Sequence, residues 1–184
     1  MARSTITRSL HDTGLAAWFG GSLMGAVGLN AAAGAVDDPR QAGRVANAGW
    51  DRWTPVNAAA IGAHLVGSVG QLASNADRVA AQRGVAGMSV VKTLLTAAAM
   101  GATAYSRVLG SKLSKAGDVP AEGGTEPSAA TPPELASAQR QLKIMQWVIP
   151  ATTGALLVVS SYAGEQQRPS EVAEGTKRRF LSRA

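Results

Sequence analysis

The feature that most constrains this chain is a set of long stretches that contain no charged side chain. Thr13–Val36 and Trp53–Ala76 each run for 24 residues without Asp, Glu, Lys or Arg, and Ile144–Gly164 runs for 21 residues. A helix needs about 20 consecutive, mostly apolar residues to cross the hydrocarbon core of a bilayer. Each of the three stretches is therefore long enough to form a transmembrane helix.

A fourth stretch, Gly84–Ser106, contains a single charged residue, Lys92. Near the end of a transmembrane helix, a lysine can extend its aliphatic stem so that the ammonium group reaches the headgroups. We therefore predict an all-α fold, an integral membrane four-helix bundle within residues 1–164. The expected spans are about 13–36, 53–76, 86–108 and 144–164, with polar loops at 37–52 and 111–143 and a basic, flexible tail at 165–184.

The long second loop has two parts with different compositions. Residues 116–133 are rich in Pro and Gly, which predicts a flexible linker outside the membrane. Residues 134–143 are good helix formers and are expected to extend the fourth helix before Pro150 kinks it. In the first loop, Trp50 and Trp53 are expected to anchor the second span at the membrane boundary, with Pro55 in its first turn.

Composition favours a membrane protein over a soluble one. Only 16% of the residues are charged, against about 25% in soluble domains. A soluble Ala-rich helical bundle is an alternative, but its helices would carry outward-facing charges every three or four residues, and these stretches do not. A cleaved signal peptide ending at Ala33–Ala35 is another alternative, and the later spans favour a retained first helix.

Small residues are expected at the helix contacts, because membrane helices associate by close backbone approach. The second span is also polar on one side, and we expect this polar face inside the bundle. It carries Asn57, His64, Gln71 and Asn75. The candidate packing residues are Gly21, Gly25, Ala59, Ala63, Gly67, Ala97 and Gly101, followed by Ala151 and Ala155 in the fourth span.

The loop charges predict the orientation of the bundle. With the N-terminus inside, ten Lys and Arg residues lie on the cytoplasmic side and eight outside. The basic C-terminal cluster and the short connection between the second and third spans, which is poor in acidic residues, favour the same choice. We therefore expect a cell-membrane protein in contact with the lipid bilayer, with both termini in the cytoplasm.

Several function classes are disfavoured by the sequence. The nucleophile elbow, the zinc-protease helix motif and the phosphate-binding loop are all missing, and the chain contains no Cys. The net charge of +6 is spread over loops without interleaved aromatic residues, so lipid headgroups are the expected partner and nucleic acid is not. We therefore expect no enzymatic activity.

The two histidines, His11 and His64, are the candidate cofactor ligands. The segment HDTGLAAWFGG resembles the first helix of CopD-like membrane proteins in its His11, Trp18, Gly20 and Gly21. The resemblance implies a copper- or haem-associated protein, with His11 as the residue carried over. A haem held by both histidines is not expected, because the predicted spans place them about 20 Å apart in depth.

Both histidines also have structural interpretations. His64 is expected to be a buried imidazole that hydrogen-bonds a neighbouring helix through Asn30, Thr96 or Thr153. His11 and Asp12 are expected to form an interfacial pair at the start of a helix. The leading hypothesis is a non-enzymatic accessory subunit or scaffold of a larger membrane complex, or a homo-oligomer, with no resident cofactor. The alternatives are haem or metal handling and transport of a small solute along Asn57, His64 and Gln71.

Overall fold

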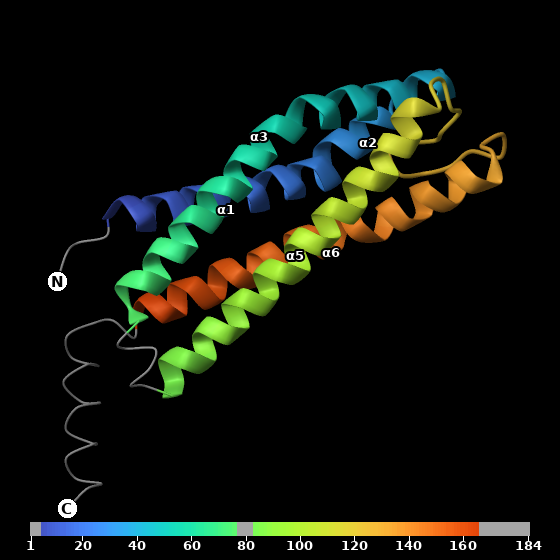
Figure 1. Cartoon of the computed structure of the whole chain (residues 1–184). Helices are drawn as coiled ribbons and strands as arrows, with labels where there is room; N and C mark the ends of the chain where they lie inside the picture. The colour runs from blue at the N-terminus through green and yellow to red at the C-terminus, as the bar shows by residue number, and fades with distance from the viewer. Residues whose placement is uncertain (1–4, 77–82, 166–184) are drawn as a thin grey trace, which may run out of the picture.

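The computed structural model describes residues 5–76 and 83–165, and these form four long helices in two hairpins (Figure 1). The first helix contains a π-helical turn. One hairpin pairs the first helix with α3, and the other pairs α5 with α6. The elements are α1 (Thr5–Met24), η1 (Gly25–Leu29), α2 (Asn30–Ala33), α3 (Pro39–Ser74), α5 (Arg83–Lys115) and α6 (Pro133–Glu165).

The first hairpin has a much tighter turn than the sequence analysis predicted. The Asp38 side chain accepts a hydrogen bond from the Arg40 backbone N–H at 2.9 Å, and Pro39 occupies the first helical position. This is an N-cap followed by a proline whose missing N–H needs no partner. The predicted loop at 37–52 is therefore mostly the beginning of α3, and Pro55 lies inside that helix rather than in its first turn.

The second loop is also shorter than expected and is packed onto the first hairpin. Helix α5 continues to Lys115 and α6 begins at Pro133, as expected for its extension, so only residues 116–132 connect them. The Ala121 N–H donates to the Pro39 carbonyl at 3.0 Å, and the Gly124 N–H donates to the Asn30 carbonyl at 3.2 Å. These contacts anchor a segment that was predicted to be a flexible linker.

Three helical segments are long and apolar enough to cross a membrane: Thr5–Ala33, Gly84–Lys115 and Pro133–Gly164. Among the described residues, α3 does not meet that standard, although four spans were predicted. Its first third is charged, and its polar side chains lower its hydropathy further. Its outer surface is nevertheless apolar beyond Trp53, where it exposes Val56, Val66, Val69 and Leu72.

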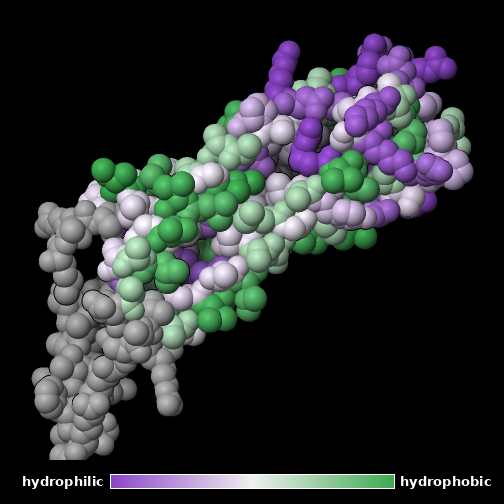
Figure 2. All heavy atoms as spheres, viewed as in Figure 1, coloured by the Kyte–Doolittle hydropathy of each residue, from purple (hydrophilic) through white to green (hydrophobic). Residues whose placement is uncertain are grey.

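Polar and apolar surfaces are separated along the length of the molecule. Hydrophilic residues gather at the end formed by the two helical connections, and hydrophobic residues cover much of the opposite half (Figure 2). At the hydrophilic end four ion pairs link the helices and the second loop. They are Arg44–Asp118, Arg107–Asp51, Lys112–Glu134 and Lys143–Glu126.

The small residues predicted to line helix contacts fall into two groups. A Cβ built on Gly67 would meet the backbone of α1 at His11, and Ala63 lies near Gly14 in the same contact. A Cβ on Gly21 would overlap the indole of Trp53, and one on Gly25 would overlap the indole of Trp50. The two tryptophans therefore pack against α1 rather than serving only as boundary anchors.

The remaining predicted packing residues do not lie at a buried helix contact in the structure. Ala59, Ala97, Ala151 and Ala155 are exposed, and a Cβ on Gly101 would meet open space. Neighbouring positions on the same helices fill the core instead. The central cluster consists of Leu15, Trp18, Ala99, Ile149 and Leu156.

Candidate functional site

The two histidines lie in direct contact between α1 and α3. Their ring centroids are 4.6 Å apart, and the side chains of His11 and His64 are 1% and 0% exposed. The contact is possible because Gly14 and Gly67 allow the two backbones to approach closely on either side of it. Helix packing therefore brings together the two residues that the sequence analysis identified separately.

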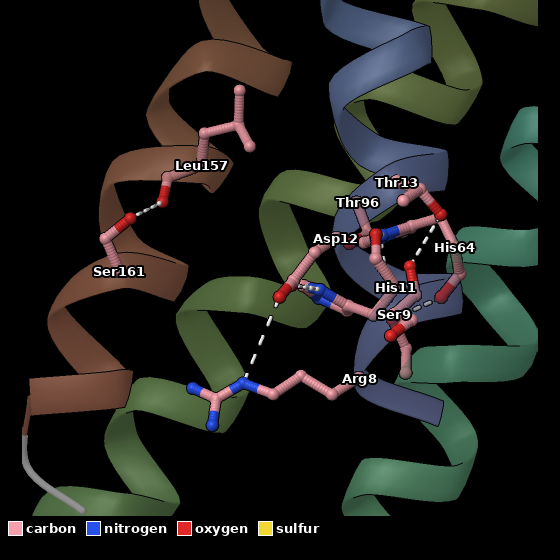
Figure 3. Close-up of polar contacts among 10 residues, drawn as sticks. Arg8, Ser9, His11, Asp12, Thr13, His64, Thr96, Leu157 and Ser161 are labelled. Carbon is pink, nitrogen blue, oxygen red and sulfur yellow. Dashed lines mark hydrogen bonds and ion pairs between the residues drawn. The ribbon is translucent and has the colours of Figure 1, made fainter. Parts of the chain in front are cut away.

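His11 has one partnered and one unpartnered ring nitrogen. Its Nδ1 lies 2.7 Å from the Asp12 carboxylate, and because a carboxylate only accepts, Nδ1 is assigned the proton that it donates (Figure 3). Its Nε2 is buried and has no hydrogen-bond partner among the described residues. His11 lies in the second turn of α1, which begins at Thr5, and it is buried, whereas the Asp12 side chain is 59% exposed, so the pair connects the interior with the surface rather than marking a helix start.

His64 connects three helices. Its Nδ1 lies 3.4 Å from the His11 carbonyl, and its Nε2 lies 3.4 Å from the Thr96 hydroxyl of α5. The Ser68 hydroxyl donates to the His64 carbonyl at 2.8 Å. Of the neighbours proposed from the sequence, Thr96 is the one that His64 contacts, whereas Asn30 bonds Gln146.

The depth argument that separated the two histidines is wrong. It assumed that the first loop spans residues 37–52, which shifts α3 relative to α1. The turn between α2 and α3 is in fact short. Each residue of the first helix therefore faces the residue of α3 that lies about the same number of residues from the turn. This register aligns His11 with His64, Gly21 with Trp53 and Gly25 with Trp50.

A haem between the two rings is excluded by this arrangement for a different reason. Axial ligands lie on opposite sides of the iron with each nitrogen about 2 Å away, so their ring centroids are about 6 Å apart. The observed 4.6 Å leaves no space for a porphyrin. Within residues 5–76 and 83–165, no group of three or more His, Cys, Asp or Glu side chains is placed to hold a metal ion.

A chamber of about 860 Å³ opens beside the histidine pair, between α1, α3, α5 and α6. Its walls combine serine, threonine and amide side chains with aliphatic ones. Hydrophilic atoms are visible between hydrophobic surfaces in this half of the molecule (Figure 2). Its polar and charged lining includes Arg8, His11, Asp12, Ser68, Gln71, Asn75, Ser89, Lys92, Thr93, Thr96, Ser160 and Ser161.

Three charged side chains face this chamber. Arg8 lies 3.9 Å from Asp12 on α1, and in Figure 3 both side chains extend into the space between α1, α5 and α6. Lys92 enters from α5 and has no ion pair or hydrogen bond with a described residue. The sequence analysis treated Lys92 as a snorkelling residue and assigned no role to Arg8. The sequence could have indicated this role, because charged residues are scarce in the apolar segments and each one there is a candidate for a functional site.

The predicted polar face of α3 is divided between two cavities. Gln71 lines the chamber, whereas Asn57 lines a second cavity of about 330 Å³ nearer the hydrophilic end. Beside the second cavity, Asn30 donates to Gln146 at 2.8 Å and accepts from the Trp50 indole N–H at 2.9 Å. His64 lies between the two cavities, so the polar residues do not form one continuous path among the described residues.

Comparison of the chain with protein-family models, with curated proteins and with solved structures finds no match. The resemblance of the first helix to CopD-like proteins therefore stays a prediction. The functional argument depends on the geometry of the chamber and of the histidine pair.

Proposed function

We propose that the chain is a non-enzymatic integral protein of the cell membrane that binds a small polar or charged ligand in the chamber. One observation carries this proposal. The segments 5–33, 53–76, 84–106 and 144–164 contain three charged residues, Arg8, Asp12 and Lys92, and all three line the chamber. Ionisable side chains within membrane helices are costly and typically mark a ligand or ion site.

The membrane setting is supported by the distribution of apolar surface. Three helical segments are long and apolar enough to span, and α3 beyond Trp53 exposes Val56 and Val66, which line neither cavity. We propose that all four helices cross the bilayer, with the polar side chains of α3 shielded by its neighbours. Thr5 and Glu165 lie at the same end of the bundle (Figure 1), and we place that end at the cytoplasmic face.

Cysteine labelling tests whether the chamber admits polar molecules. The chain contains no Cys, so a single introduced thiol reports one position. Ala97 lines the chamber, whereas its neighbour Ala98 is exposed on another face of α5 and lines neither cavity. We expect a water-soluble, negatively charged thiol reagent to label Ala97→Cys in detergent-purified protein at least ten times faster than Ala98→Cys.

The comparison of the two cysteine variants also defines the result that would refute the proposal. Equal, slow labelling at both positions would mean that the chamber is closed to water-soluble molecules. Faster labelling at Ala98→Cys would mean that the chamber side of α5 is assigned incorrectly.

A second role, as a subunit of a larger complex or a homo-oligomer, is favoured by the outer face of α5. Small and branched residues are exposed there at helical spacing, and such faces allow close packing of membrane helices. The residues are Leu94, Ala98, Gly101 and Val108, none of which lines either cavity. The two roles are compatible, because a neighbouring subunit on this face would cover α5 and leave α1, α3 and α6 around the chamber.

A further inference from the structure

We infer that the chamber binds an anionic phospholipid, with its phosphate between Arg8 and Lys92 and a hydrocarbon chain along the inner apolar walls. This inference rests on the proposed function and names the ligand class for the same site. It follows from the charge balance, the order of the lining residues and the partly open shape of the chamber.

The charge balance favours an anion. Two cationic side chains and one carboxylate line the chamber. Asp12 is already engaged, because it accepts from His11 at 2.7 Å and lies 3.9 Å from Arg8. Asp12 also acts electrostatically on Lys92, but one carboxylate balances only one of the two cations, so the charged side chains of the lining carry a net positive charge. A phosphate provides acceptor oxygens for both cations.

The order of the lining residues favours an amphiphile over a free oxyanion. On α1, Ala16 follows Asp12 by about one helical turn toward the middle of the bundle, and on α5, Met100 follows Lys92 by about two turns. Leu157 of α6 lies beside the same inner region. Inward from the charged residues the walls therefore become apolar, and Val85 and Met88 add apolar wall on the chain-end side of Lys92.

A phospholipid of the cytoplasmic leaflet is arranged in the same way, with its headgroup at the interface and its hydrocarbon chains toward the middle of the bilayer. Arg8 lies about one helical turn from the start of α1, which places its guanidinium near the proposed cytoplasmic interface. A headgroup bound there would direct its hydrocarbon chain toward Ala16, Met100 and Leu157, in the middle of the bilayer. A free phosphate would leave these apolar walls without an apolar partner.

The size and opening of the chamber are compatible with such a ligand. Its volume of about 860 Å³ falls in the upper part of the usual range of small-molecule sites, roughly 300–1,000 Å³. The chamber is only partly enclosed, so a second hydrocarbon chain can remain in the bilayer. Around it, the buried atoms His11 Nε2, Gln71 Nε2 and Ser160 Oγ have no partner within the described ranges, and headgroup oxygens or accompanying water can supply partners.

Lipid titration followed by native mass spectrometry tests the inference on the full chain in a neutral detergent. The probes are phosphatidylglycerol, phosphatidylcholine with the same acyl chains, and inorganic phosphate. We expect phosphatidylglycerol to bind at one site at least ten times more tightly than phosphatidylcholine, and millimolar phosphate not to displace it. We expect Lys92→Gln to weaken phosphatidylglycerol binding about tenfold, because it removes one charge-assisted contact.

The matched control is Lys115→Gln, which removes the same charge from an exposed position at the other end of α5. This variant should bind phosphatidylglycerol like the parent protein. Equal binding of the two lipids, or equal loss in Lys92→Gln and Lys115→Gln, would overturn the inference. Full displacement by inorganic phosphate would assign the site to a free oxyanion and overturn the lipid inference alone.

The cysteine-labelling experiment separates this inference from the proposed function. If Ala97→Cys is labelled selectively but no lipid binds at a single site, the chamber is accessible and its ligand is not a phospholipid. If Ala97→Cys and Ala98→Cys are labelled equally slowly, the proposed function also fails. Protection of Ala97→Cys by phosphatidylglycerol and not by phosphatidylcholine is the expected result when both proposals hold.

Discussion

Replacing Gly67 by alanine should destabilise the protein, whereas the same replacement at Gly62 should not. Both glycines lie on α3, so each substitution adds one methyl group to the same helix. A Cβ at Gly67 would lie 2.5 Å from the Thr7 carbonyl oxygen and 2.7 Å from the His11 Cα. A Cβ at Gly62 would have no other heavy atom within 4 Å.

The magnitude follows from the rigidity of these neighbours. The three nearest atoms, which include the still closer His11 backbone N, all belong to the backbone, so α1 and α3 must move apart by at least about 0.7 Å for the 2.7 Å contact to reach 3.4 Å. Overpacking of this kind typically costs about 1–3 kcal/mol. The gain in helix propensity from glycine to alanine, about 0.8–1 kcal/mol, is common to both variants and cancels in their difference.

The difference between the variants should therefore be about 1–3 kcal/mol, with Gly67→Ala the less stable. For a protein of this size, about 1 kcal/mol changes the midpoint of thermal unfolding by roughly 2–4 °C. Fluorescence-detected size exclusion after heating at a fixed rate in one detergent measures this midpoint for both variants. Midpoints within 1 °C of each other would refute the close approach of α1 and α3 at Gly67.

Two further predictions concern the rest of the fold. Asn30→Ala removes side-chain hydrogen bonds to Gln146 and Trp50 at a position only 7% exposed, so we expect a loss of about 2–4 kcal/mol in the same thermal assay. A change below about 0.5 kcal/mol would show that these bonds do not stabilise the fold. A topology reporter fused to the C-terminus should be active in the cytoplasm, and the protein should stay with the membrane after alkaline carbonate extraction. Activity of that reporter only outside the cell would invert the proposed orientation.

Charge spacing located the helices in the sequence but did not define their ends. Most of each uncharged stretch is helical, because a helix satisfies its backbone groups whether or not it lies in a membrane, but residues 34–36 form a turn and Asn75 lies beyond the end of α3. The polar segment 39–52 belongs to α3. The N-cap at Asp38 and the proline at Pro39 start this helix before its apolar part. That start signal is present in the sequence and was outweighed by the polarity of the segment.

The candidate site was only partly predictable, because side-chain contacts depend on helix register. His11 and His64 were identified as candidates, and the structure brings them together. Their contact depends on where the second helix of the hairpin begins, and the 14 residues between the predicted start at Trp53 and the observed start at Pro39 correspond to about four helical turns. That Ala97 faces the chamber and Gly101 faces outward depends on how α5 rotates about its axis, which a chain rich in small residues does not specify strongly.

The energetics of Arg8, Asp12 and Lys92 connect the fold to the proposed site. At the centre of a membrane helix one such charge costs about 2.5–3.5 kcal/mol, and the cost falls toward the interface, where Arg8 lies. Even one such cost is a large part of the stability of a typical domain, about 5–15 kcal/mol. A bundle selected for stability alone would place apolar residues at these positions. Because all three line one chamber, water or a polar ligand in the chamber can solvate them together. The same three charges can then hold that ligand.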